Sequence, residues 1–232
     1  MLKKRPAGER GHFNFGWLDT NHSFSFGEYY DPAHMGFRSL RVINDDVIMG
    51  GQGFGTHPHQ NMEILTYVLE GELAHKDSMG TGSVIYPGDV QRMSAGTGVT
   101  HSEFNNSEVE ASHLLQIWVI PEKEGLKPSY EQRNFDESEK KNRLRLIASR
   151  NGDEGSVVMH QDIKIYSSIL EDSQNLSFTA SPQRYYWIQM VKGNLSVNGM
   201  GLQSGDGLAI EKEAQLDFKA SENSEFLLFD LA

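Results

Sequence analysis

The sequence predicts an all-β protein made of two β-barrel or β-sandwich domains in tandem. Its 232 residues include 23 glycines and 7 prolines, which separate short apolar runs rich in β-branched and aromatic residues. Many short strands at regular spacing are typical of sandwiches and barrels. No long apolar stripe with the period of a helix is present. The length is sufficient for one or two domains with sizeable cores.

Nine apolar runs are candidate strands, and one polar stretch is a candidate connector. The runs lie at residues 39–43, 62–69, 83–86, 113–120, 163–170, 186–191, 195–197, 208–210 and 225–231. The stretch 131–145 carries many charges and offers little to bury, so it predicts a surface loop or a short helix.

A weak internal repeat indicates that the two domains are similar. The segment 67–74, YVLEGELA, resembles 189–196, QMVKGNLS, because each has an apolar strand, a turn glycine and a second strand. Farther along, the tripeptide 87–89, PGD, has a counterpart at 204–206, SGD. Gly-Asp alone is a common turn signal, so the inference depends on the order of both features. We expect domains at residues 1–130 and 131–232.

Composition and charge exclude several classes of function. Without cysteine the chain has no disulfide, no thiolate metal site and no cysteine nucleophile, so a bound metal must use nitrogen and oxygen ligands. The net charge of −11 disfavours direct contact with nucleic acid or an anionic membrane, although it is compatible with a basic protein partner. The apolar runs are too short to cross a bilayer, and the basic N-terminus is not followed by an apolar signal segment. We expect a cytoplasmic monomer.

The segment 51–63 holds two histidines with the spacing of metal ligands. His57 and His59 are two residues apart, so on an extended strand both imidazoles point to the same face. Pro58 between them cannot donate to a neighbouring strand, which indicates an edge or a bulge. The alternative interpretation is a surface histidine pair in a glycine-rich loop.

A second pair with the same spacing strengthens the metal hypothesis. His101 and Glu103 share one strand face, while Ser102 and Phe104 take the other. If this strand faces the first across a barrel, three imidazoles and one carboxylate meet. Such a set suits one divalent ion of Fe, Mn, Co, Ni or Cu with one or two open positions, and Zn also fits.

These motifs resemble those of a known family. The pattern G-x5-H-x-H-x3-E-x7-G from Gly51 to Gly71, followed by G-x2-H-x3-N from Gly98 to Asn105, resembles the two motifs of the cupin superfamily. The segments GWLDTNHSFSFGEYYDP, GFRSLRVINDD and SAGTGVTHSEFN resemble the pirin family, in particular bacterial pirin-like quercetinases. The resemblance is dense over the first half and reaches the second half through the repeat. It implies a bicupin, with two β-barrel or jelly-roll domains in tandem.

The resemblance also implies a ligand set. Two departures from the general cupin pattern are the seven residues, where six are usual, before Gly71 and the missing proline in the second motif. General cupins take their carboxylate from the first motif, which here would be Glu63, whereas pirins use the glutamate of the second motif. The metal ligands implied are therefore His57, His59, His101 and Glu103. Glu63 becomes a candidate for orienting an imidazole from behind.

The activity implied is oxygen-dependent cleavage of the central heterocycle of a flavonol such as quercetin, with release of carbon monoxide and a depside. In this hypothesis Glu103 is also the catalytic base that takes the proton of the flavonol hydroxyl. An alternative is a metal-binding regulatory or interaction protein without flavonol turnover, as eukaryotic pirins imply. A different oxygenase or isomerase on the same scaffold is a third.

The second half is expected to lack the metal. Alignment on the repeat glycines places Thr179 and Ser181 opposite the first histidine pair, and Phe218 and Ala220 opposite the second pair. None of these four side chains can replace an imidazole or carboxylate ligand. His160 is expected at the surface or between the domains.

The remaining histidines receive no metal role. His34, His75 and His113 have no partner at ligand spacing. His12 and His22 lie in the aromatic-rich stretch 12–26, whose alternation predicts a half-buried strand with a role in core packing. The alternative is a pocket wall, since a flat polyphenol would stack on such rings.

Overall fold

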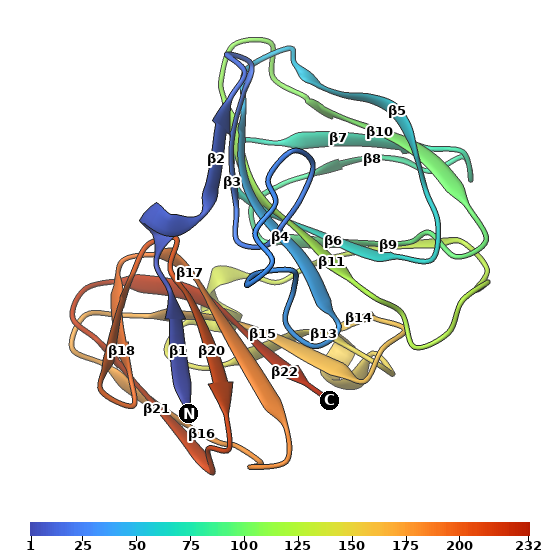
Figure 1. The fold of residues 1–232 in the computed structure, drawn as a ribbon. Helices are drawn as coiled ribbons and strands as arrows, with labels where there is room; N and C mark the ends of the chain where they lie inside the picture. The colour runs from blue at the N-terminus through green and yellow to red at the C-terminus, as the bar shows by residue number, and fades with distance from the viewer. The chain divides into compact units, whose positions relative to one another are not determined.

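The computed structural model describes residues 1–232 and is built almost entirely of β-strands (Figure 1). The chain divides into two compact units. The N-terminal unit comprises Gly11–Asn134 and Val157–Gln161, and the C-terminal unit comprises Met1–Arg10, Phe135–Ser156 and Asp162–Ala232. The predicted all-β class with two similar β-domains is confirmed. No helix has the length and apolar character needed to cross a membrane.

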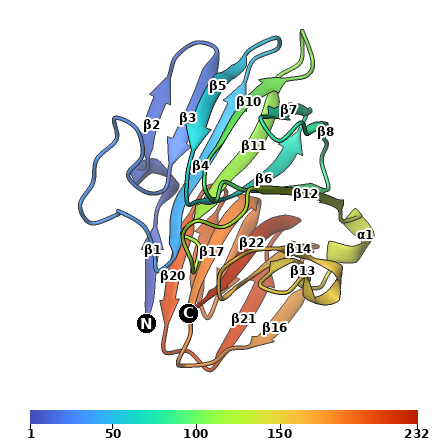
Figure 2. The ribbon, with the colours of Figure 1, turned by 90° about the vertical axis from the view of Figure 1, so that its right-hand side faces the viewer.

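The N-terminal unit contains two antiparallel sheets, and Figure 2 shows the strands of the smaller sheet, β5, β10, β7 and β8, beside those of the larger. The larger sheet has the order β12-β9-β6-β11-β4-β3-β2. The strands of this unit are β2 (Gly11–Asn14), β3 (Leu18–His22), β4 (Leu40–Ile48), β5 (Gly53–His59), β6 (Glu63–Glu70), β7 (Leu73–Asp77), β8 (Gly82–Ile85), β9 (Asp89–Ser94), β10 (Val99–Asn105), β11 (Ser112–Val119), β12 (Ser129–Asn134) and β14 (Val157–Val158).

The C-terminal unit repeats this arrangement. Its smaller sheet has the order β16-β21-β18-β19, and its larger sheet includes the run β1-β20-β17-β22-β15-β13. Its strands are β1 (Leu2–Arg5), β13 (Arg145–Ser149), β15 (Ile163–Leu170), β16 (Asn175–Thr179), β17 (Tyr185–Lys192), β18 (Asn194–Val197), β19 (Met200–Gln203), β20 (Gly207–Glu211), β21 (Gln215–Ala220) and β22 (Ser224–Leu231). Its helical turns are η1 (Ala7–Glu9), α1 (Glu137–Lys140) and η2 (Asp153–Gly155).

All nine predicted strands correspond to strands of the structure, but the sequence analysis did not identify several others. Among these, β1 and β12 are mostly polar, whereas β16 and β21 alternate between apolar and polar residues and could have been predicted from that alternation. The connector is partly as predicted. Residues 131–134 belong to β12, whereas α1 begins at a capping box in which Asp136 accepts from the backbone N–H of Ser138.

The internal repeat corresponds to equivalent turns in the two units. Gly71 joins β6 to β7 with φ 73°, and Gly193 joins β17 to β18 with φ 81°. Both conformations lie in the left-handed region that glycine adopts without strain. Each turn also passes close to another backbone segment: a Cβ atom on Gly193 would lie 2.4 Å from the carbonyl oxygen of Asn223. The repeated glycine is therefore required by geometry in both units.

The boundaries of the units differ from the predicted ranges 1–130 and 131–232. The N-terminal residues pack with the C-terminal unit because β1 pairs with β20, with Leu2 opposite Ile210. Residues 157–161 instead pack with the N-terminal unit. A short polar strand such as β1 gives no sign in the sequence of a partner about 200 residues away. As domains, the two predicted ranges stay a prediction.

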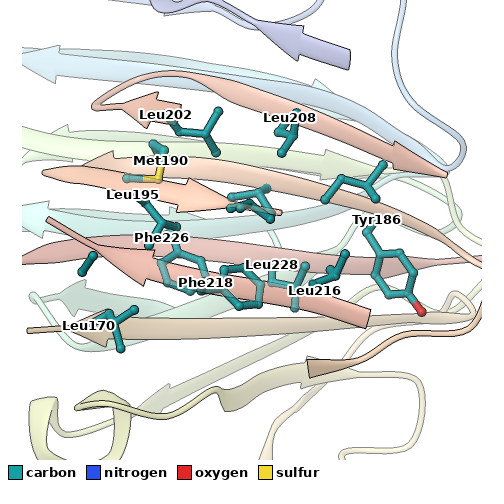
Figure 3. Packing of buried hydrophobic residues seen from close by; sticks show 14 of the residues in the cluster. Leu170, Tyr186, Met190, Leu195, Leu202, Leu208, Leu216, Phe218, Phe226 and Leu228 are labelled. Atoms are coloured by element: carbon teal, nitrogen blue, oxygen red, sulfur yellow. The ribbon is translucent and has the colours of Figure 1, made fainter. Parts of the chain in front are cut away.

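An apolar interior stabilises the C-terminal unit. Figure 3 shows Phe218 and Phe226 packed among leucine side chains between its sheets. These two rings stack with centroids 5.0 Å apart and an interplanar angle of 16°. Both are at most 1% exposed, so this interior excludes water.

We expect Gly193→Ala to destabilise the protein by about 2 kcal/mol or more, because the new methyl group meets a carbonyl oxygen in a left-handed backbone conformation. The midpoint of urea unfolding, followed by tryptophan fluorescence, measures the effect. Gly201→Ala on β19 is the control, since a Cβ atom there meets nothing within 4 Å. Equal midpoints for the two variants would contradict the prediction.

Candidate metal centre

The strands that carry the two histidine motifs, β5 and β10, are neighbours in the smaller sheet. They pair antiparallel, with His57 opposite His101 and His59 opposite Val99. The expectation that they face each other across a barrel is therefore wrong. They lie side by side because the turn between β5 and β6 sends the chain to the larger sheet before it returns as β10. Pro58 lies on an edge strand, as predicted, where its missing N–H costs no hydrogen bond.

The pairing brings the three predicted histidines together. The ring centroid of His57 is 4.5 Å from that of His101, and His59 is 4.8 Å from both. One ring nitrogen of each residue lies within 4.8 Å of those of the other two. Three imidazoles at this separation could converge on a single divalent ion with modest side-chain adjustment.

The hydrogen bonds of these rings fit a metal ligand role. The Nδ1 atom of His57 lies 2.8 Å from the carbonyl oxygen of Gly55, to which only an N–H can donate, so its Nε2 keeps the lone pair. The Nε2 atom of His101 is buried and has no hydrogen-bond partner. Since buried polar atoms normally have a partner, this nitrogen beside two other imidazoles is a donor atom that a metal ion would satisfy.

Burial also keeps the rings neutral. It lowers the pKa of His59 to about 4, with a further contribution from the neighbouring His57. Burial and the adjacent imidazoles lower the pKa of His101 to about 2. Since a metal binds the neutral imidazole, both rings are ready to coordinate at neutral pH.

Glu103 lies near these histidines but belongs to a different cluster of possible metal ligands. Its side chain is buried, and the side-chain amide of Gln116 on β11 donates to both carboxylate oxygens, at 3.2 and 2.9 Å. A register shift separates it from His101 on β10. A carboxylate oxygen of Glu103 clusters with ring nitrogens of His75 and His101, not with all three predicted histidines. Burial raises the pKa of the Glu103 carboxyl.

The histidines open into a cavity of about 230 Å³. Its apolar walls are Phe26, Phe54, Ile64 and Trp118, and its polar lining consists of Asn44, Asp46, Gln116 and the four predicted ligands. Thr20 donates a hydrogen bond to Asp46, whose pKa burial raises to about 7. The cavity therefore combines flat aromatic surfaces with a few buried polar groups.

A second cavity of about 220 Å³ shares four of these residues, Phe26, Asn44, Asp46 and Phe54. Phe13 and Phe15 line it and stack on each other with centroids 6.0 Å apart. Core packing is the wrong interpretation for Phe15, which is 58% exposed. Both interpretations apply within this stretch: Phe24, at 2% exposed, belongs to the core, and His12 is exposed, whereas His22 is buried and lines the second cavity with Phe13 and Phe15.

Glu63 does not reach the histidines. It lies next to Ile64 on β6, and because Ile64 lines the cavity, the alternation of the strand turns Glu63 to the other face. There it accepts hydrogen bonds from Ser94 at 2.9 Å and from the backbone N–H of His160 at 3.2 Å. Its expected role of orienting an imidazole ligand is not supported. His160, half-buried, packs with the N-terminal unit.

Several residues of this site belong to no motif and were not predicted. Asn44 and Asp46 occupy alternate positions of β4 that Val42 and Ile48 continue as buried apolar residues. Polar residues on the buried face of an otherwise apolar strand were the available signal. Gln116 breaks the apolar run of β11 in the same way.

Comparisons with known proteins cover both halves of the chain. Residues 3–119 match the family model described as Pirin, and residues 146–231 match the one described as the quercetinase C-terminal cupin domain. The chain is 53% identical to a quercetin 2,3-dioxygenase of Escherichia coli, over 100% of this chain and 99% of that protein. It is 35% identical to a pirin-like protein of Caulobacter vibrioides over the full length of both.

A solved structure shows the same fold. The crystal structure of the bacterial pirin YhhW from Escherichia coli in complex with nickel(II) matches with a TM-score of 0.95 and 50% sequence identity. The match covers 100% of this chain and 99% of that one. These likenesses confirm the bicupin architecture and the resemblance of the histidine motifs, and the chain belongs to the pirin family.

Proposed function

We propose that this protein is a metal-dependent dioxygenase that cleaves the central heterocycle of a flavonol such as quercetin with O2, releasing carbon monoxide and a depside. The observation that carries the proposal is that one cavity with aromatic walls is lined by the cluster of His57, His59 and His101 and by the buried carboxylate of Glu103. The name of the relative that is 53% identical supports the same activity. We further propose a cytoplasmic monomer.

The proposed ligands are His57, His59, His101 and Glu103, which would hold one divalent ion. Nitrogen and oxygen donors of this kind suit Fe, Mn, Co, Ni or Cu, and also Zn. The nickel(II) in the structure of the relative YhhW supports an ion of this class. When bound, the ion supplies a Lewis acid that polarises a substrate oxygen and a template that orients the substrate.

Glu103 is the proposed catalytic base. Its buried carboxylate lines the cavity, where it could accept the proton of a flavonol hydroxyl. Gln116 donates to both oxygens and so holds the carboxylate against the larger sheet, facing the cavity. Three neighbouring imidazoles would retain the ion while the carboxylate receives the proton.

The two adjoining cavities favour a flat substrate with more than one ring. A ring in the first cavity would lie near the histidines, against Trp118 and Phe54. A second ring would extend past Phe26 towards the stacked pair Phe13 and Phe15. Aromatic walls bind such rings by stacking and by burial of apolar surface.

Purified protein loaded with each ion in turn, and supplied with quercetin and O2, tests the proposal. We expect loss of flavonol absorbance together with one molecule of carbon monoxide for each flavonol consumed. If no ion among Fe, Mn, Co, Ni and Cu supports turnover, the dioxygenase proposal is wrong and the alternative of a metal-binding regulatory protein is favoured.

The variant Glu103→Gln distinguishes the role of Glu103 as a base from its role as a metal ligand. We expect turnover per bound ion to fall by about 10²- to 10⁴-fold, because the amide cannot accept the proton, while metal content falls much less. Elemental analysis and the flavonol assay measure the two quantities. Glu63→Gln is the matched control, since Glu63 is equally buried but faces away from the cavity. Parallel loss of metal and activity in Glu103→Gln would leave Glu103 as a ligand alone.

Phe15→Ala tests the second cavity as a ring-binding site. We expect KM for quercetin to rise roughly fivefold, which corresponds to about 1 kcal/mol of lost stacking, with little change in metal content. Tyr30→Ala is the control, because Tyr30 is also exposed, at 73%, and does not line either cavity. An unchanged KM in Phe15→Ala would show that the substrate does not extend past Phe26.

A further inference from the structure

His75, which the sequence analysis left without a role, lies directly behind the histidine cluster. It is on β7, which pairs with β10 so that His75 is opposite Glu103 and Asp77 is opposite His101. The ring centroids of His75 and His101 are 5.3 Å apart, and their Nδ1 atoms are 3.5 Å apart. The side chains of His75 and Asp77 are both fully buried, so water does not compete for their hydrogen bonds.

Asp77 determines which nitrogen of His75 carries hydrogen. Its Oδ2 lies 3.1 Å from the Nε2 atom of His75, while its Oδ1 accepts from the backbone N–H groups of Met79 and Thr81 at 2.8 and 3.0 Å. These backbone bonds fix the carboxylate in place at the turn between β7 and β8. A carboxylate only accepts, so the hydrogen of a neutral His75 is on Nε2 and its Nδ1 keeps the lone pair.

The hydrogen bond with His75 also determines which nitrogen of His101 carries hydrogen. Because the Nδ1 atom of His75 can only accept, the facing Nδ1 of His101 is the donor. A neutral His101 then has its lone pair on Nε2, the buried nitrogen that has no hydrogen-bond partner. For each neutral ring only one tautomer is compatible with these hydrogen bonds. The lone pair on the Nε2 atom of His101 therefore lies beside His57 and His59.

We propose that Asp77 and His75 are positioning residues that fix the tautomer and the ring orientation of His101 for the metal ion. This inference rests on the proposed metal site. Ligand histidines commonly donate their second N–H to a carboxylate or carbonyl group, and here a second histidine, itself oriented by a carboxylate, accepts it. The ring of Tyr130 packs on His75 with centroids 5.0 Å apart and limits its rotation.

The substitution Asp77→Asn exchanges donor and acceptor in the hydrogen bonds of His75 and His101, and the side chain at position 77 keeps its size and shape. The oxygen of the new side-chain amide can keep the two backbone hydrogen bonds, so the amide nitrogen faces the Nε2 atom of His75 and donates to it. The hydrogen of His75 then moves to Nδ1, which turns the Nδ1 of His101 into an acceptor and puts a hydrogen on its Nε2. We expect the affinity for Ni²⁺ to fall about 10- to 100-fold.

Affinity for Ni²⁺, measured on the full chain by competition with a chelator at pH 8, is the readout and needs no flavonol turnover. Asp45→Asn is the matched control, since Asp45 pairs with His113 at 2.7 Å away from the cavity, and it should leave the affinity unchanged. Equal affinity of Asp77→Asn and the unsubstituted protein would overturn the inference.

Two substitutions at His75 keep the test decisive if Asp77→Asn does not fold. In His75→Gln the amide can donate to Asp77 and accept from His101, so we expect nearly normal affinity. In His75→Leu no acceptor remains, and we expect the affinity to fall as in Asp77→Asn. Equal affinity of the two variants would overturn the inference.

The number of ions bound is a further discriminator. Two Ni²⁺ per chain would also overturn the inference, because His75 would then be a ligand within its own group with His101 and Glu103. Absence of Ni²⁺ binding by the unsubstituted protein would reject the proposed metal site itself, whereas flavonol inactivity with normal Ni²⁺ binding would reject only the dioxygenase.

Discussion

The antiparallel pairing of β5 with β10 is the constraint on which the site depends. It sets His57 opposite His101, and strand alternation then brings His59 to the same face. A shift of the register by one residue would turn the imidazoles of one strand away from those of the other. Gly53 permits the close approach at the end of the pairing, because a Cβ atom there would lie 2.3 Å from the carbonyl oxygen of Glu103.

The smaller sheets of the two units are equivalent, but the interior that they enclose is apolar in the C-terminal unit and partly polar in the N-terminal unit. The central strands β10 and β21 occupy the same place in the orders β5-β10-β7-β8 and β16-β21-β18-β19. On β21 the residues Phe218 and Ala220 complete an apolar cluster, whereas β10 presents His101 and Glu103. Replacing buried charged or polar groups by well-packed apolar residues is often neutral or stabilising, so the polar interior is better explained by function than by stability. That the C-terminal unit holds no metal stays a prediction.

Local patterns in the sequence predicted the longer apolar strands and the histidine pairs, because both depend on spacing along one strand. The antiparallel pairing of β5 with β10 could not be predicted, since it is set by pairing between segments about 40 residues apart. His75 and Asp77 have the same two-residue spacing as His101 and Glu103, which was an available signal, but the relation of His75 to His101 exists only through the pairing of β7 with β10. Asn44 and Asp46 could have been predicted from the sequence, because they are polar residues on the buried face of a strand.

Strand alternation also explains why this chain would use the carboxylate of its second motif. Glu63 begins β6 with its side chain on the face opposite Ile64, so no rotamer brings it into the cavity. On that face it accepts hydrogen bonds from Ser94 and His160 and holds residues 157–161 in the N-terminal unit. Glu103 has the same parity as His101 and therefore enters the cavity with it. Of the two glutamates in these motifs, Glu63 therefore contributes to packing within the N-terminal unit, whereas Glu103 lines the cavity.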